Sequence, residues 1–241
     1  MVFYFNYFFR FLGYYFRAGT RYDIHSPFVA DFVQKILEDR RWYYPFSDIE
    51  HLRQELKRSR RQVTVADHGA GSKATPARTV RTVGSLARHV AVEPAAGRRL
   101  FHLVRHYRPA TILELGTSLG LGTLYLSAAS STALLRTIEG CPATAALARE
   151  HFDRFHRSNV ELLVGPFDDR LPAALDSIER LDLLYLDGDH RRSATLRYVE
   201  QCLEKAGPDS IFVIADIYWS TEMKAAWEVL RHHPRVRLSI D

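Results

Sequence analysis

This sequence of 241 residues is poor in cysteine, and that scarcity excludes several kinds of protein. Its two cysteines, Cys141 and Cys202, are too few for a disulfide framework, and their spacing is not that of a zinc site. The N-terminus has neither the basic start nor the small-residue cleavage site of a secretory signal. These absences predict a cytoplasmic protein.

The chain also lacks an apolar run long enough to span a membrane as a helix. Its most apolar stretch, residues 2–16 (VFYFNYFFRFLGYYF), is short, strongly aromatic and interrupted by Arg10. Three interpretations of this stretch remain open: a helix docked on the core or in a homodimer interface, a helix lying at a membrane surface, and a lid over an apolar substrate. Peripheral association with a membrane therefore stays an alternative within the cytoplasmic assignment.

Positive charge is concentrated in the first part of the chain. Residues 1–110 hold 19 Lys and Arg against 9 Asp and Glu, whereas residues 111–241 hold 14 against 19. A basic run of this kind is typical of a solvated helix face, or of a surface for an anionic partner such as a phosphate group or a membrane. No RNA-binding motif accompanies it, so nucleic acid is not an expected partner. The run comprises Arg53, Lys57, Arg58, Arg60 and Arg61.

The second half of the chain shows a regular alternation of strand and helix patterns, which predicts an α/β fold with a parallel sheet. In such a sheet, ligands bind at the carboxyl ends of the strands. Glu139, Asp187, His190 and Asp216 all fall at such ends. The predicted strands are 112–115, 133–138, 160–165, 181–186 and 210–215, and the predicted helices are 121–129, 142–155 and 191–203.

The first part of the chain is expected to be mainly helical and to form an extension. A helix over 29–37 follows Ser26 and Pro27, which make a good helix start. We also predict a helix over 48–60, a strand over 63–66, a glycine-containing loop over 67–73 and a helix over 95–107. We therefore expect an N-terminal extension, residues 1–94, that provides lid, dimer or partner contacts, and a ligand-binding domain, residues 95–241.

The most informative stretch runs from Thr111 to Gly122 (TILELGTSLGLG). A buried strand, a glycine-rich turn and an apolar helix follow one another, which brings backbone N–H groups close to a nucleotide-like ligand. The spacing is not the G-x-G-x-x-G of dinucleotide sites, because Ser118 stands where the second glycine would be. The pattern E-x-G-x-S-x-G-x-G resembles the first motif of class I S-adenosylmethionine-dependent methyltransferases.

This resemblance implies a Rossmann-like methyltransferase sheet flanked by helices and a set of donor contacts. S-adenosylmethionine is the implied cofactor. Glu139 lies at the tip of the second strand, the position at which such folds bind the two ribose hydroxyls. The residues after the third strand, 166–169, lie where the family recognises the adenine. The implied cofactor-binding residues are Glu114, Gly116, Thr117, Ser118, Gly120, Glu139, Gly165, Phe167 and Asp187.

Other motifs resemble small-molecule O-methyltransferases. A helix with a G-x-x-L pattern (Gly97 to Leu100) precedes the first strand, as in the catechol-type enzymes, and Asp187 begins a D-G-x-H motif like that of sugar O-methyltransferases. H-S-P-F near the N-terminus resembles an uncharacterised bacterial subgroup. The implied acceptor is a hydroxyl group of a small molecule.

Two devices for removing the acceptor's proton are available. His190 is a candidate general base, because imidazole titrates near neutral pH. Alternatively, Asp187 and Asp216 are candidate ligands of Mg²⁺, which lowers the pKa of a bound hydroxyl. The catechol-type pattern has an asparagine where this chain has Ile217, so one ligand is missing unless Asp189 replaces it. The candidate catalytic residues are His190, Asp187 and Asp216.

Two other functions compete with methyl transfer. Gly116-Thr117-Ser118-Leu119-Gly120 also fits G-x-S-x-G, the nucleophile elbow of α/β-hydrolases, with Asp187 and His190 as the remaining members of a triad. This hypothesis leaves Glu139 without a role. The other alternative is a non-catalytic, cofactor-binding scaffold.

The expected sheet departs from the methyltransferase pattern at its last strands. Residues 236–240 fit a sixth strand, after which the sequence ends, so the seventh strand of the family is missing. We expect either a truncated chain or another element, such as residues 63–66, in that slot. An unfilled slot would leave strand edges exposed and favour association.

Overall fold

The computed structural model describes residues 24–66 and 78–241, which fall into two compact units divided between Arg41 and Trp42. The aromatic stretch 2–16 and the glycine loop 67–73 lie outside the described residues, so the predictions for them remain predictions.

In the described part of the first unit, a helical segment begins at Pro27. Helix α2 (Pro27–Phe32) continues into a π-helical turn, η2 (Val33–Leu37). The Ser26 hydroxyl accepts a hydrogen bond from the backbone N–H of Val29 at 3.5 Å, and Pro27 occupies the first turn, where its missing N–H costs nothing. The helix predicted over 29–37 is thus confirmed, with a start two residues earlier.

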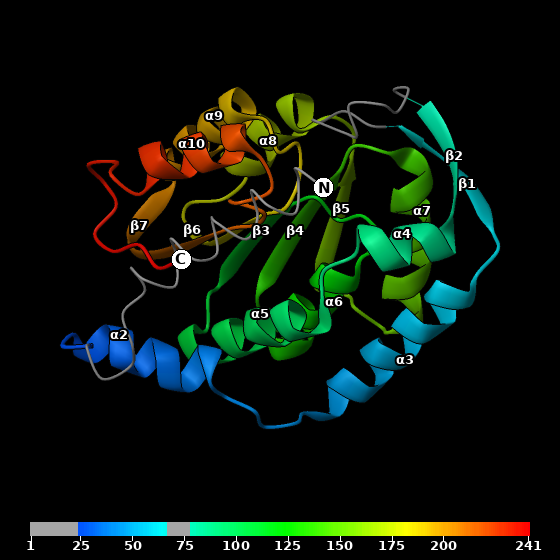
Figure 1. Cartoon of the computed structure of the whole chain (residues 1–241), viewed down its shortest axis with the longest axis horizontal. Coiled ribbons are helices and arrows are strands. Elements are labelled where there is room, and N and C mark those ends of the chain that lie inside the picture. The colour runs from blue at the N-terminus through cyan, green and yellow to red at the C-terminus, as the bar shows by residue number, and fades with distance from the viewer. Residues whose placement is uncertain (1–23, 67–77) are drawn as a thin grey trace, which may run out of the picture. The chain divides into compact units, whose positions relative to one another are not determined.

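The second unit is built on a parallel sheet of five strands in the order β5-β4-β3-β6-β7 (Figure 1). The first strand of this sheet in the chain, β3, lies at its centre, so β4 pairs on one side of it and β6 on the other. In open α/β sheets, ligands bind outside the carboxyl ends of the strands at such a reversal of direction, which here lies at β3. The strands are β3 (Thr111–Leu115), β4 (Leu134–Glu139), β5 (Val160–Val164), β6 (Leu181–Leu186) and β7 (Ala206–Ile214).

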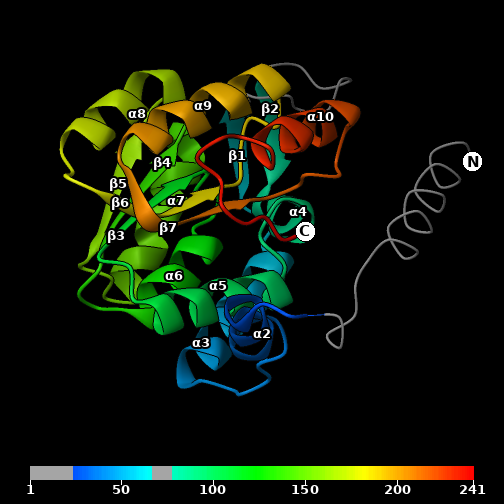
Figure 2. The same cartoon turned by 90° about the vertical axis from the view of Figure 1, so that its left-hand side faces the viewer.

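Helices cover both faces of this sheet (Figures 1 and 2). On one face, Leu113 and Leu115 pack with the helices that follow the later strands. On the other, Leu121 belongs to a cluster with Phe101 and Leu147. The first group is α8 (Phe167–Asp176), α9 (Arg192–Glu204) and α10 (Thr221–Leu230), and the second includes α5 (Pro94–Tyr107), α6 (Leu121–Ala129) and α7 (Pro142–Arg154). The α/β fold predicted from the alternation is confirmed.

Helix α3 (Tyr44–Arg58) extends the second cluster and begins four residues before its predicted start. Its basic run is not a uniformly solvated face, because Arg53 is only 1% exposed and lies 3.8 Å from Glu50. A short helix, α4 (Val83–His89), packs against α3.

Strands β1 (Gln62–Ala66) and β2 (Arg78–Thr82) pair with each other as a separate antiparallel sheet. The backbone N–H of Ala66 contacts Cys141 Sγ at 3.3 Å, just after β4. Residues 63–66 therefore do not fill the slot beside β7, because they are engaged at a different part of the sheet.

The prediction of a sixth strand over 236–240 is wrong. This segment follows a turn in which the Arg235 guanidinium donates to the backbone carbonyls of Leu203 and Ala206, and it forms no strand. Leu238 is 47% exposed, so its apolar alternation is not used in a sheet. Among the described residues, β7 pairs with β6 alone.

No helix in the described part of the chain is both long and apolar enough to cross a membrane.

Candidate functional site

A predicted site residue lies at or just after the carboxyl end of every strand of the parallel sheet, and the parallel order brings these ends to one edge (Figure 1). The glycine loop follows β3, Glu139 ends β4 and Gly165 follows β5. Asp187 follows β6, and Asp216 comes two residues after β7. The predicted residues therefore share one edge of the sheet.

The glycine loop turns sharply between β3 and α6. Gly116 has φ +109° and Gly120 has φ +78°, values that favour glycine. A Cβ on Gly116 would lie 2.1 Å from the backbone carbonyl oxygen of Asp187, so this loop and the loop after β6 are in direct contact. Ser118 adopts φ +50°, and its backbone N–H donates to Glu139 Oε2 at 2.7 Å.

Glu114 is buried within β3, with an exposure of 1%. Its Oε2 accepts hydrogen bonds from the hydroxyls of Thr123 and Thr137. The Thr117 hydroxyl in turn lies 2.5 Å from that of Thr137, so the side chain of Thr117 is held inside the protein. Glu114 Oε1 is buried without a hydrogen-bond partner, next to Gly122, where a Cβ would lie 2.9 Å from it. The Glu114 carboxylate is thus buried beneath the glycine loop, and its oxygen Oε1 is still able to accept a hydrogen bond.

Burial raises the pKa of Glu114 from 4.5 to about 7. The folded state therefore holds this proton more tightly than the unfolded state, and the stabilisation present below pH 4.5 is lost as the pH rises through about 7. The difference corresponds to roughly 3 kcal/mol. We expect Glu114→Gln to flatten the fall in the free energy of unfolding between pH 4.5 and about 7, measured by urea denaturation.

The control for this prediction is Glu161→Gln, which removes a half-exposed carboxylate paired with Arg136 on the strands β4 and β5. That variant should keep the wild-type slope. A Glu114→Gln protein whose unfolding free energy falls with pH as steeply as that of the wild type would contradict the role of Glu114.

Glu139 anchors the turn between β4 and α7. Its Oε1 accepts from the backbone N–H of Cys141 at 2.9 Å and from the Thr144 hydroxyl at 3.0 Å, while Oε2 is bonded to Ser118. Glu139 is half-buried. The carboxylate therefore stands between the glycine loop and α7.

The residues after β5 form the next part of the edge. Gly165 has φ +142°, and its N–H donates to the Glu139 carbonyl at 2.9 Å. The ring of Phe167 lies against Gly188, where a Cβ would meet it at 2.9 Å. The segment predicted to read an adenine thus contacts the loop after β6.

Asp187, His190 and Asp216 come together at this edge. His190 Nε2 lies 3.9 Å from Asp187 Oδ1 and 3.7 Å from Asp216 Oδ2. One ligand atom from each of the three residues lies within 4.8 Å of the others, a separation that suits a divalent cation. Asp187 is additionally bound by the Tyr185 hydroxyl at 2.7 Å. Burial raises the pKa of the Asp187 carboxyl, and the hydrogen bond from Tyr185 opposes that rise.

Asp189 does not belong to this group, so the suggestion that it replaces the missing metal ligand is not supported by the geometry. Its carboxylate is 6% exposed and binds Arg191 and Tyr198 instead. His190, which the metal hypothesis had not included, occupies the third position.

Trp219 borders the group on its β7 side, and Tyr218 precedes it in the chain. The rings of His190 and Trp219 have centroids 5.7 Å apart, and Trp219 is 50% exposed. The Tyr218 hydroxyl donates to Asp241 Oδ2 at 2.5 Å. An exposed indole therefore stands next to the imidazole.

Sequence reasoning missed two residues that shape the site. His151, on α7, is buried, and its Nδ1 lies 2.8 Å from the Leu119 carbonyl oxygen. This contact holds the glycine loop against α7. Nothing in the sequence marked it. Tyr185 was detectable, because it precedes Asp187 by two residues and so lies on the same side of the strand.

Comparison with protein families matches residues 113–217 to a methyltransferase domain. Among curated proteins, the human transmembrane O-methyltransferase is 36% identical over 130 residues, which cover 51% of this chain and 44% of that protein. A catechol O-methyltransferase from Niastella koreensis is 28% identical over 131 residues, covering 53% of this chain and 58% of that protein. The chain thus matches about half the length of these curated relatives.

Solved structures share the fold. An O-methyltransferase from Bacillus cereus, solved in complex with SAH, has a TM-score of 0.57 at 19% identity, and each chain is covered to 86%. TomG, an O-methyltransferase from Streptomyces achromogenes solved with SAM, has a TM-score of 0.54 at 18% identity, covering 79% of this chain and 78% of that one. At these identities the likeness establishes the arrangement of the sheet and helices.

Proposed function

We propose that this chain, which carries a methyltransferase domain on the class I fold, transfers a methyl group from S-adenosylmethionine to a hydroxyl group of a small molecule. One observation carries the proposal. The glycine loop after β3 and the group Asp187, His190 and Asp216 abut at one edge of the sheet, because Gly116 packs directly on the Asp187 carbonyl. A donor held on the loop is thereby next to a base.

The residues present fit the donor. Gly116 and Gly120 provide a turn without side chains, and Glu139 provides a carboxylate at the end of β4 for two hydroxyl groups. The unused, buried Glu114 Oε1 fits a cationic group beside Gly122. Phe167 offers an apolar ring for a base. Gly165, Thr117 and Ser118 complete the set by backbone contacts.

S-adenosylmethionine supplies a methyl group already activated on a sulfonium sulfur. The protein therefore has to align the acceptor and remove the hydroxyl proton. His190 takes this proton at Nε2, and Asp187 and Asp216 stabilise the imidazolium that forms, because their oxygens lie within 4 Å of the same nitrogen. Trp219 borders the space in which the acceptor would stand.

A divalent cation is the alternative means of activating the hydroxyl. Asp187 and Asp216 would hold it, with His190 as a third ligand, and it would lower the pKa of the acceptor hydroxyl. We propose residues 95–241 as the part that holds both substrates and residues 1–94 as the part that makes lid, dimer or partner contacts.

The serine-hydrolase alternative is tested with Ser118→Ala. A methyltransferase contacts its donor here mainly through the backbone, so we expect the variant to retain methyl transfer and to bind SAH less than about 10-fold more weakly. A hydrolase would lose its nucleophile, and ester hydrolysis would fall by several orders of magnitude.

The measurements are transfer of a labelled methyl group to a set of hydroxyl compounds, hydrolysis of p-nitrophenyl acetate, and calorimetry with SAH. The hydrolase hypothesis also leaves Glu139 without a role, although its carboxylate accepts a hydrogen bond from the backbone N–H of Ser118. Labelling of the wild-type protein, but not of Ser118→Ala, by a fluorophosphonate probe would overturn the proposal.

A further inference from the structure

The loop between β6 and α9 holds two successive residues in a left-handed conformation. Asp189 has φ +65° and His190 has φ +40°. Neither residue is a glycine, so this conformation is unfavourable and persists only where the surrounding contacts hold it.

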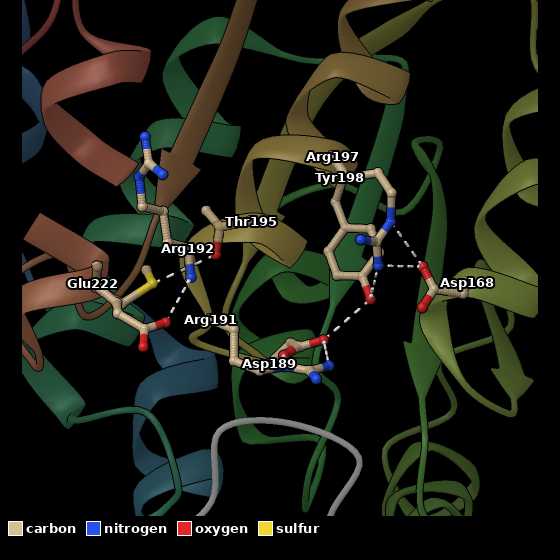
Figure 3. Close-up of polar contacts among 9 residues, drawn as sticks. Asp168, Asp189, Arg191, Arg192, Thr195, Arg197, Tyr198 and Glu222 are labelled. Carbon is tan, nitrogen blue, oxygen red and sulfur yellow. Dashed lines mark hydrogen bonds and ion pairs between the residues drawn. The ribbon is translucent and has the colours of Figure 1, made fainter. Parts of the chain in front are cut away.

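Both oxygens of the Asp189 carboxylate are bound (Figure 3). Arg191 Nε donates to Oδ1, Arg191 Nη2 donates to Oδ2 at 2.8 Å, and the hydroxyl of Tyr198 donates to Oδ2 at 3.1 Å. The carboxylate is 6% exposed and Tyr198 is 2% exposed, whereas the Arg191 side chain is 47% exposed, so the contact with Tyr198 is the more shielded of the two. The loop is thereby tied to the second turn of α9.

The anchoring point lies one residue before His190. The distances from His190 Nε2 to Asp187 and Asp216, 3.9 and 3.7 Å, are longer than hydrogen bonds, so those carboxylates alone do not fix the ring. The backbone N–H of His190 donates to the Gly188 carbonyl at 2.9 Å, which closes the turn around Asp189. The direction of the imidazole therefore depends on how Asp189 is held.

The same helix also reaches the donor side of the site. The ring of Tyr198 packs edge-on against Phe167 at 5.6 Å, and Arg197 binds Asp168 Oδ1 at 2.6 Å (Figure 3). Gly188 also lies against the Phe167 ring, because a Cβ on this glycine would meet the ring. Helix α9 thus contacts both Asp189 and Phe167 through Tyr198.

We propose that Asp189 is the positioning residue of His190: its carboxylate, clamped by Arg191 and Tyr198, holds the left-handed turn that places the imidazole between Asp187 and Asp216. This inference rests on the proposed function, since it concerns the base of the same reaction. It assigns Asp189 no contact with donor or acceptor.

The test is a double-mutant cycle on kcat for methyl transfer, with Asp189→Ala, His190→Ala and the pair. If Asp189 acts through His190, Asp189→Ala lowers kcat about 10-fold in the wild type and less than about 2-fold when His190 is already absent. Calorimetry with SAH should give a Kd within about 2-fold of the wild type in all three variants. Equal losses of kcat in both backgrounds would overturn the proposal.

Tyr198→Phe is the milder variant, because it removes only the hydroxyl that binds Asp189 and keeps the ring on Phe167. It should reduce kcat several-fold without changing the Kd of SAH. Glu222→Gln is the matched control, because Glu222 contacts the backbone N–H of Arg192 at the start of the same helix but not Asp189 (Figure 3). It should leave kcat unchanged, and an equal loss there would point to general loosening of α9.

Crystal structures of the wild type and Asp189→Ala decide the same point without turnover. We expect His190 Nε2 to leave both carboxylates in the variant, and an unmoved ring would overturn the proposal. A wild-type protein that binds SAH but methylates no acceptor would speak against the proposed function, whereas the position of the ring would still test the role of Asp189.

Discussion

His190→Gln is expected to lower kcat for methyl transfer by about 10²- to 10⁴-fold, the usual contribution of a general base. Glutamine keeps the size and polarity of the side chain but cannot take up the acceptor's proton. Among the three clustered side chains, the imidazole nitrogen Nε2 lies within 4 Å of a carboxylate oxygen of each aspartate. Steady-state kinetics with a labelled methyl donor measures the loss, and the Kd of SAH should stay within about 2-fold.

The matched control is His232→Gln, at the end of α10, where Nδ1 lies 2.8 Å from the Glu228 carbonyl oxygen. It should leave kcat unchanged.

Treatment of the wild type with EDTA distinguishes proton removal by His190 from activation of the hydroxyl by a bound cation. Activity that survives EDTA but not His190→Gln assigns the proton to the imidazole, whereas activity lost with EDTA and restored by Mg²⁺ assigns it to a bound cation. Full activity of His190→Gln would exclude both the base and the third ligand.

Glu139→Ala is expected to weaken SAH binding about 100-fold or more. Each hydrogen bond to a charged group contributes roughly 1.5–3 kcal/mol, and the carboxylate is proposed to hold two ribose hydroxyls. Loss of the side chain also frees the backbone N–H groups of Ser118 and Cys141, which loosens the glycine loop. Isothermal titration calorimetry gives the Kd, and a melting curve shows whether the variant is folded.

Glu150→Ala is the control for this measurement. Glu150 lies on α7, as does Thr144, but its side chain is about half exposed and pairs with Arg61 instead of with Glu139. Its loss should leave the Kd of SAH unchanged. A folded Glu139→Ala protein that binds SAH as tightly as the wild type would place the donor elsewhere.

The sheet strands and the residues at their ends were predictable because both are local properties of the sequence. Apolar runs of five or six residues alternate with amphipathic stretches, so β3, β4, β5 and β6 were placed within one or two residues. Once the strands are parallel, their carboxyl ends must meet, and Glu139, Asp187 and Asp216 follow. The start of helix α3 was predicted four residues too late, because its first turn is aromatic and lacks a helical pattern of its own. This turn is helical because Phe46 packs into the core.

The sixth strand could not be judged from its alternation alone. Residues 236–240 have the right pattern, but a strand forms only where a neighbouring edge is within hydrogen-bonding reach. In the structure the turn at Arg235 is tied to the carbonyls of Leu203 and Ala206, and the segment that follows joins no sheet. Strands β1 and β2 pair with each other for the same reason: the partner of a strand is set by the tertiary arrangement.

By itself, the sequence determined the fold class, the order of the elements and the chemical types at the carboxyl edge, because periodicity and motif spacing are written along the chain. Only the tertiary structure decided how those groups are used. It turned Asp189 away to Arg191 and brought His190 in between Asp187 and Asp216. It also buried Glu114 deeply enough to raise its pKa to about 7. Distances and burial depend on residues far apart in the chain, so no local pattern contains them.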